Sequence, residues 1–125
     1  MGTKEYLEQL MDLDKKIDSK MRERKWIVRR ADWYGLTEES ELKLRKYDEE
    51  VNDYIDELLE LEITVSEEIM HLEDYTHQMV LRERYMFGKK WQQIADEQHY
   101  DVATIHRLHN KALEEFEKVR LTSSK

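Results

Sequence analysis

The amino-acid sequence predicts an all-α protein, and its composition supports this fold class in three ways. Charged residues make up 40% of the 125 residues, there is no proline, and only three residues are glycine. Chains rich in Glu, Lys and Leu with so few helix breakers are usually long helices. A sheet would need many more turn residues than this chain has, so we expect helices only.

The first helix is expected over residues 4–30. Its apolar residues recur at spacings near three and four, which places them on one face of a helix. These residues are Tyr6, Leu10, Leu13, Ile17, Met21 and Ile27. Gly35 is the expected left-handed residue that follows this helix. Thr37 is expected to cap a second helix, with Glu38 and Glu39 at the positive end of its dipole.

The second helix carries the most regular apolar pattern in the chain, with spacings that alternate between three and four. The residues in this pattern are Leu44, Tyr47, Val51, Tyr54, Leu58, Leu61 and Val65. Such a pattern predicts a coiled-coil seam, and two helices of similar length with a short connection pack antiparallel as a helical hairpin. Either the two apolar stripes cover one another within one chain, or part of the surface forms a dimer. We expect a homodimer, because two helices alone bury little core.

The heptad phase is interrupted at Ser66, where a new apolar stripe begins with Ile69 and Leu72. Either Ser66 caps a third helix, or one long helix continues through a stutter. We place a domain boundary at this point. The helical hairpin then occupies residues 1–65, and a second domain occupies residues 66–125.

Within the second domain, residues 89–121 are expected to form two helices around a tight turn at residues 98–100. Trp91 and Ile94 face inward on the first of these helices. Asp101 follows the turn and is expected to cap the second helix.

The second of these helices sorts into two faces when each residue is advanced by about 100° around the helix axis. The inward face is expected to hold Ile105, Leu108, Ala112 and Phe116. The outward face is expected to hold Ala103, His106, Arg107 and Asn110. A short helix, a tight turn and a second helix with a small, polar and basic outer face form a helix-turn-helix. In that motif the second helix enters the DNA major groove, where its first residues meet base edges.

The distribution of charge decides which part of the chain can meet DNA. The formal net charge of −8 argues against a nucleic-acid partner for the chain as a whole. Residues 1–88 have a net charge of −9, however, and residues 89–125 have a net charge of +1. We therefore expect only the C-terminal face to dock on DNA, because the acidic surface before it repels phosphate.

Three histidines lie close together in the sequence, yet we expect no metal site among them. His109 borders the buried stripe, His99 lies in the turn, and only His106 faces outward. Zinc would need further ligands, and the chain has no cysteine to supply them. No acid or nucleophile accompanies these histidines, and there is no glycine-rich phosphate loop. We expect no cofactor, no catalytic residue and no enzymatic activity.

The absence of cysteine fits a reducing cytoplasm. No apolar run approaches the roughly 20 residues that span a bilayer, and the N-terminus lacks the apolar region of a signal peptide. We expect a cytoplasmic protein with no membrane partner.

Several short motifs follow one another from residue 81 to residue 116. They are Arg84-Tyr85, Gly88, Trp91, Ile94-Ala95, Tyr100, Thr104-Ile105, Arg107-Leu108-His109 and Ala112-Leu113. In this order they resemble the fourth region of bacterial sigma factors, which reads a promoter element. They are more similar still to the phage late-gene transcription activators of the RinA type, found in Gram-positive bacteria. The resemblance implies sequence-specific binding of double-stranded DNA near a promoter in a bacterial host cell, with contact to RNA polymerase.

The resemblance also implies which side chains meet DNA. The residues expected to face the bases are Val102, Ala103, His106, Arg107 and Asn110. The residues expected to meet phosphate are Arg82, Lys89, Lys90, Thr104 and Lys111. Arg107 has the geometry to bind guanine through two hydrogen bonds, and Val102 and Ala103 suit the methyl group of thymine. Two features depart from the family. Lys90 stands where serine is frequent, and Asp101-Val102-Ala103 replaces a start that is usually rich in arginine.

Lys89 and Lys90 leave two interpretations open. Cations at a helix N-terminus oppose the helix dipole, and solvent can screen that repulsion. Alternatively, the two lysines and the helix N-terminus together bind a phosphate.

The function predicted from the sequence is that of a DNA-binding transcription regulator, an activator of phage or prophage late genes. One alternative is a packaging protein of the small-terminase kind, which also joins a helix-turn-helix to coiled-coil helices and assembles into rings. Another is an adaptor that contacts RNA polymerase and has lost affinity for DNA.

Overall fold

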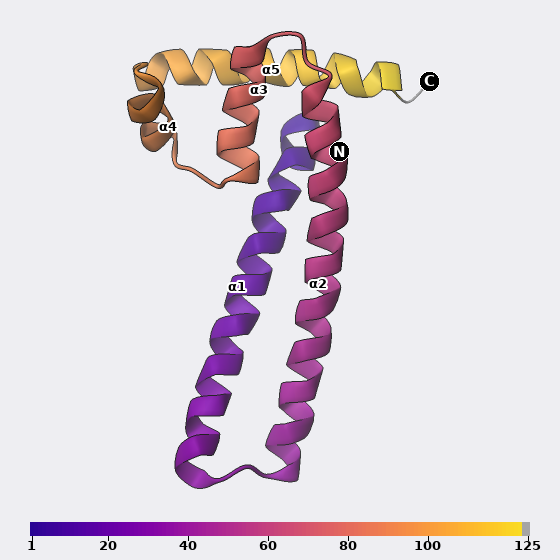
Figure 1. Ribbon diagram of the computed structural model, residues 1–125, viewed down its shortest axis with the longest axis vertical. Helices are drawn as coiled ribbons and strands as arrows, with labels where there is room; N and C mark the ends of the chain where they lie inside the picture. Colours follow the sequence, from indigo (N-terminus) through magenta and orange to yellow (C-terminus); the bar gives the residue numbers. More distant parts are fainter. Residues whose placement is uncertain (124–125) are drawn as a thin grey trace. The chain divides into compact units, whose positions relative to one another are not determined.

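The computed structural model describes residues 1–123, and every regular element within them is a helix (Figure 1). The elements in chain order are α1 (Thr3–Tyr34), α2 (Glu38–Met70), α3 (Tyr75–Leu81), the π-helical segment η1 (Arg82–Met86), α4 (Trp91–Gln98) and α5 (Val102–Ser123). The prediction of an all-α protein is confirmed for these residues.

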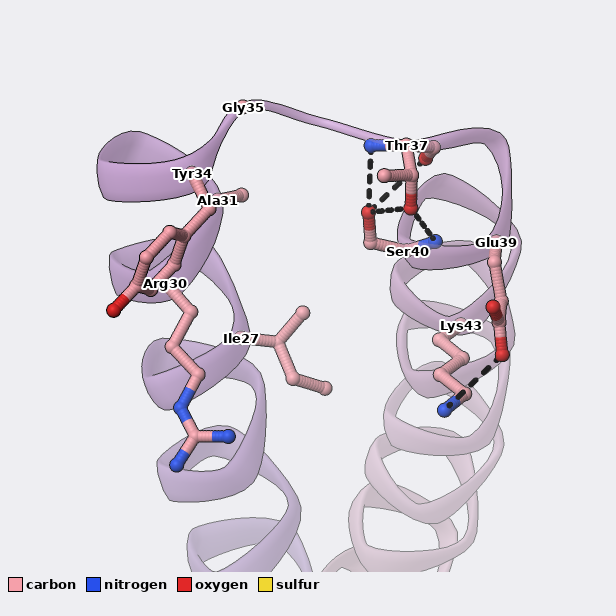
Figure 2. Close-up of a pocket in the computed structure, with 9 residues that line it drawn as sticks. All are labelled: Ile27, Arg30, Ala31, Tyr34, Gly35, Thr37, Glu39, Ser40 and Lys43. Atoms are coloured by element: carbon pink, nitrogen blue, oxygen red, sulfur yellow. Dashed lines mark hydrogen bonds and ion pairs between the residues drawn. The ribbon is translucent and has the colours of Figure 1, made fainter.

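The turn between α1 and α2 is built from one glycine and a reciprocal pair of hydroxyl groups. Gly35 has a φ of 86° and donates its N–H to the Ala31 carbonyl at 2.7 Å, a backbone conformation that glycine adopts without strain. The Thr37 hydroxyl accepts from the Ser40 amide at 3.1 Å, and Ser40 Oγ accepts from the Thr37 amide at 2.9 Å (Figure 2). The expected left-handed Gly35 and the expected Thr37 cap are both confirmed.

The helix α2 runs without interruption past Ser66. A single helix through residues 44–80 is wrong, because α2 ends at Met70 and α3 begins at Tyr75. The alternative in which Ser66 caps a new helix is also wrong. The reason is that the apolar seam continues through this point, since Val65 and Ile69 lie one turn apart and are both fully buried. All seven residues of the predicted heptad pattern are buried or half-buried.

The described chain divides into two compact units. One, which we call the two-helix unit, comprises residues 12–60. The other, which we call the core unit, combines residues 1–11 with the described residues from 61 onward. We expected one boundary, between residues 65 and 66. Instead the start of α1 belongs with the C-terminal helices, because Leu7 and Leu10 are buried there.

In the two-helix unit, ion pairs join α1 to α2. Lys20 Nζ lies 2.9 Å from Glu50 Oε2, and Arg24 Nε lies 2.6 Å from Asp48 Oδ1. The partner number on α2 falls as the number on α1 rises, so the paired segments run in opposite directions. The pairs are partly exposed, and each therefore contributes little stability.

The core unit is held together by residues from both ends of the chain. The Tyr6 ring stacks on Phe116 with 6.2 Å between ring centres, and its hydroxyl donates to Glu68 Oε1 at 2.6 Å. The Arg120 guanidinium lies 3.6 Å from the centre of the same ring. Burial and the nearby Glu68 carboxylate raise the pKa of Tyr6 to about 12.

The helix α3 begins at an aspartate cap. Asp74 Oδ1 accepts from the amides of Thr76 and His77, at 2.9 and 3.3 Å, which satisfies two N–H groups that the helix leaves free. The helix passes directly into η1, where the Phe87 amide donates to the Arg82 carbonyl at 3.0 Å. The helical stretch ends before Gly88, whose φ is 67°.

Candidate nucleic-acid interface

A small apolar cluster fixes α4 and α5 against each other. Ile94, Ala95 and Ile105 are fully buried in it, and the half-buried side chains packed against them are Met79, Trp91, Val102 and Leu108. Burial of three such side chains between α4 and α5 stabilises the mutual orientation of these helices by several kcal/mol at about 25 cal/mol per Å². The cluster therefore sets which side of α5 is left to solvent.

The connection between α4 and α5 is a left-handed turn followed by a cap. His99 has a φ of 61°, unusual for a residue with a Cβ. The Tyr100 amide donates to the Ala95 carbonyl at 2.9 Å, and Asp101 Oδ1 accepts from the Thr104 amide at 2.7 Å. Hydrogen bonding to the Thr104 hydroxyl, and next to the Thr104 amide, lowers the pKa of Asp101. The expected Asp101 cap is confirmed.

The outward side of α5 carries four of the five residues expected to face bases. Ala103, His106, Arg107 and Asn110 are exposed, and so is Lys111. On the opposite side Ile105, Ala112 and Phe116 are fully buried and Leu108 is half-buried. The two-sided sorting of α5 that the sequence predicts is confirmed.

The side chains of Val102 and Thr104 are less exposed to solvent than those of Ala103, His106, Arg107, Asn110 and Lys111. Val102 is half-buried and packs against the apolar cluster. Thr104 is also half-buried, and its hydroxyl accepts from Arg107 Nη2 at 3.0 Å. Arg107 is therefore held one turn from the start of α5, with Thr104 orienting its guanidinium.

The ring of Trp91 supports this surface from behind. His106 and His109 pack on it with 4.9 and 4.5 Å between ring centres. The Arg84 guanidinium lies 4.6 Å from the ring centre and donates to the Lys89 carbonyl at 2.9 Å. An arginine over a tryptophan face is a favourable cation–π pair, so Arg84 and His106 are both held in place by one side chain.

His109 is the buried partner of Tyr85. The Tyr85 hydroxyl and His109 Nε2 are 2.6 Å apart, and both side chains are almost wholly buried. Burial lowers the pKa of His109 to about 4, with smaller contributions from Lys4, His106 and Arg84. The imidazole is therefore neutral at pH 7 and belongs to the core, as expected from its place on the helix. Burial also raises the pKa of Tyr85 to about 12.

The lysines before α4 differ from each other. Lys89 Nζ lies 2.5 Å from Glu83 Oε2 and 2.7 Å from Glu97 Oε2, and these two carboxylates raise its pKa. Lys90 is exposed and occupies the cap position of α4, where no side chain accepts from the helix amides. At the N-terminus of α4, Lys89 is therefore neutralised by carboxylates and Lys90 is exposed to solvent. Arg82 lies half-buried in η1.

The pairing of Arg84 with Trp91 and that of Tyr85 with His109 were not predicted from the sequence. Arg84-Tyr85 entered only as part of a family pattern. Both pairings depend on the π-helical segment η1, which turns adjacent residues toward different neighbours. The apolar spacing of the sequence alone does not reveal where such a segment lies. The expected roles of His106 and Arg107 did not depend on it.

Comparison of the chain with models of protein families, with curated proteins and with solved structures gives no match. Among residues 1–123, no group of three or more His, Cys, Asp or Glu side chains is arranged to hold a metal ion. None of the described helices is both long enough and apolar enough to cross a membrane.

Proposed function

We propose that this chain is a sequence-specific DNA-binding transcription regulator that activates phage or prophage late genes, of the RinA type. In this proposal α4 and α5 form a helix-turn-helix like that of sigma-factor region four. The chain acts near a promoter in the cytoplasm of a bacterial host cell and contacts RNA polymerase. The hairpin of α1 and α2 serves for homodimer formation or for the polymerase contact.

One observation carries the proposal. The first three turns of α5 expose Ala103, His106, Arg107 and Asn110 on one side, while the other side is anchored in a core. A major groove admits a helix with small and polar outward residues, and rigid support keeps the reading residues in register with the bases. Arg107 would bind guanine, and Ala103 would meet a thymine methyl group.

The cations around this surface are candidates for phosphate contact. Lys90 and Lys111 are exposed, and Lys90 stands at the N-terminus of α4, where backbone amides also favour an anion. Lys89 can take part only if Glu83 or Glu97 releases it. We therefore expect fewer phosphate contacts than the sequence alone suggests, and a correspondingly moderate dependence of affinity on salt.

The test is selection of bound duplexes from random DNA, followed by mobility-shift titration of the recovered site. We expect one enriched motif, an affinity for it that exceeds the affinity for scrambled DNA by at least about 10³-fold, and weaker binding as salt increases. Equal affinity for all duplexes would contradict sequence-specific binding.

A second candidate is an adaptor that contacts RNA polymerase without binding DNA. Two observations favour it, namely the commitment of Lys89 to two carboxylates and the inward packing of Val102. The same titration separates the candidates, because an adaptor binds no duplex at low salt yet still associates with purified polymerase.

A further inference from the structure

The two-helix unit leaves many of its large apolar side chains exposed to solvent. Three of its hydrophobic residues are buried, namely Leu13, Ala31 and Val51. Its exposed large hydrophobic residues are Met21, Trp26, Trp33, Tyr34, Leu36, Leu42, Ile55 and Leu59. Exposed apolar surface in such quantity marks a place of association.

Two of these residues share a face of α1 with arginines. Trp26 and Trp33 are one heptad apart and therefore point the same way, and their side chains are 60% and 78% exposed. Arg22, Arg29 and Arg30 flank them on the exposed side of the helix, with the Arg29 guanidinium 5.7 Å from the centre of the Trp26 ring. We call these five residues the tryptophan–arginine face.

This face has the opposite charge from most of the chain. Residues 22–33 carry a net charge of +3, whereas the chain has a net charge of −8. In Figure 2 the Arg30 guanidinium extends along α1, and the side chains of Arg29 and Arg30 are both exposed. Arg29 and Arg30 are thus available to carboxylates of a partner.

A complementary face lies on α2 of the same unit. Residues 48–60 include seven carboxylates and no lysine or arginine. Ile55 and Leu59 are one turn apart and exposed at 37% and 51%. Glu49 and Asp56 are one heptad apart and lie beside them, also exposed. We call Glu49, Ile55, Asp56 and Leu59 the acidic face.

We propose that the tryptophan–arginine face of one copy of this chain docks on the acidic face of a second copy, and that this contact forms the homodimer. The inference rests on the homodimer of the proposed function and not on DNA binding. Tryptophan and arginine are the side chains that most often dominate an interface energetically. The opposite charges determine which faces meet and disfavour the pairing of two like faces.

The pairing accounts for both faces at once. Each copy presents one face of each kind, so a two-fold arrangement makes the contact twice and closes the assembly as a dimer. The aromatic and aliphatic side chains form the apolar centre of the contact, and the arginines and carboxylates form its polar rim, as in protein interfaces generally.

Sedimentation equilibrium of the full chain tests this proposal. We expect the wild type to be dimeric at micromolar concentration. The double variant Arg29→Glu/Arg30→Glu and the double variant Glu49→Lys/Asp56→Lys should each dissociate at least roughly tenfold more readily. An equimolar mixture of the two variants should again form dimers, because the reversed charges then attract.

Two controls keep the outcome interpretable. Lys118→Glu reverses an exposed cation of α5 outside both faces and should leave the dimer unchanged, and circular dichroism should show unchanged helicity in every variant. A monomeric wild type overturns the proposal, including one that binds vesicles of anionic lipid through its tryptophans. So does a dimer that neither double variant weakens.

The result is separable from that of the DNA experiment. A monomer that selects one DNA motif overturns the docking of the two faces and leaves the regulator proposal in place. A dimer that responds to the charge reversals as expected but binds no duplex supports the docking of the two faces and overturns the regulator proposal.

Discussion

The two compact units of this chain are both helical, yet they are stabilised in different ways. The core unit buries thirteen hydrophobic residues and the two-helix unit buries three. The core unit also holds the buried Tyr85–His109 pair, whereas the polar contacts of the two-helix unit include exposed or partly exposed ion pairs, cation–π contacts and hydroxyl caps. Burial of apolar area is the main source of stability, so the two units should respond very differently to substitution.

Because of this difference, each unit suits a different kind of function. A surface that reads DNA needs rigid support, and α5 has it because its inner side is closed by Ile105, Ala112 and Phe116. A surface that associates with a partner needs exposed apolar side chains, and the two-helix unit has them.

Phe116→Ala should destabilise the core unit by about 3–5 kcal/mol, because it empties a fully buried site against the Tyr6 ring. Urea unfolding monitored by circular dichroism measures the change. The matched control is Trp33→Ala, which removes an exposed ring and should change stability by less than about 0.5 kcal/mol in dilute, monomeric protein. Similar losses in both variants would abolish the contrast between the units.

The stability of the core unit should fall as the pH falls from about 6.5 to about 4, because of His109. In that interval the unfolded chain binds a proton at this imidazole and the folded chain does not, since its folded pKa is about 4. The expected loss is about 1.4 kcal/mol per pH unit and about 3 kcal/mol in total. Urea midpoints measured across this range give the slope.

The matched variant for this prediction is His109→Gln, which keeps a polar partner for Tyr85 and removes the titration. Carboxylates titrate in both proteins, so the difference between their slopes isolates His109. Equal slopes would show that the imidazole is not the group responsible.

Arg107→Ala should weaken binding of the selected duplex by about 1–3 kcal/mol and relax the preference at one base pair. The side chain is exposed and its recorded bond is to Thr104, so unfolding should be unaffected. Mobility-shift titrations against single-base variants of the site measure both effects. Lys118→Ala, farther along α5, is the control and should leave the base preference intact.

Thr37→Ala should destabilise the two-helix unit by about 1 kcal/mol, because the amide of Ser40 then loses its acceptor. Hydrogen exchange at the start of α2 should speed up accordingly. Thr122→Ala changes an exposed threonine in the last turn of α5 and should leave exchange in α2 unchanged.

The smallest expected effect concerns the ion pair between Arg24 and Asp48. A double-mutant cycle with Arg24→Ala and Asp48→Ala should give a coupling energy of about 0.2–1 kcal/mol that decreases with added salt. A coupling of several kcal/mol would mean that the two-helix unit is held by its charges after all.

Helical pattern was sufficient to predict much of the fold. The alternating spacing from Leu44 to Val65 marks residues that are buried or half-buried, and Gly35, Thr37 and Asp101 act as turn and cap as their chemistry predicts. The continuity of α2 through Ser66 was undecidable, because serine is equally able to cap a helix or to lie within one.

The extent of the core unit was not predictable from local pattern. Leu7 and Leu10 carry the same spacing as the rest of α1, and nothing in that spacing says that they belong to the core unit rather than to the two-helix unit. At the candidate site, exposure of His106 and Arg107 follows from helical phase, but the two ion pairs of Lys89 do not. They depend on where η1 and α4 bring Glu83 and Glu97, which is a tertiary property.

The π-helical segment from Arg82 to Met86 has a consequence for engineering. A π turn holds one more residue than an α turn over the same rise, so deleting one residue there can restore regular helix without breaking the chain. The part of the chain after the deletion would then keep roughly its place, whereas the side chains inside the former π turn would change direction by up to about 100°. Tyr85 would leave His109 and Arg84 would leave Trp91, so a one-residue shortening should release the support of α5 while preserving helix content.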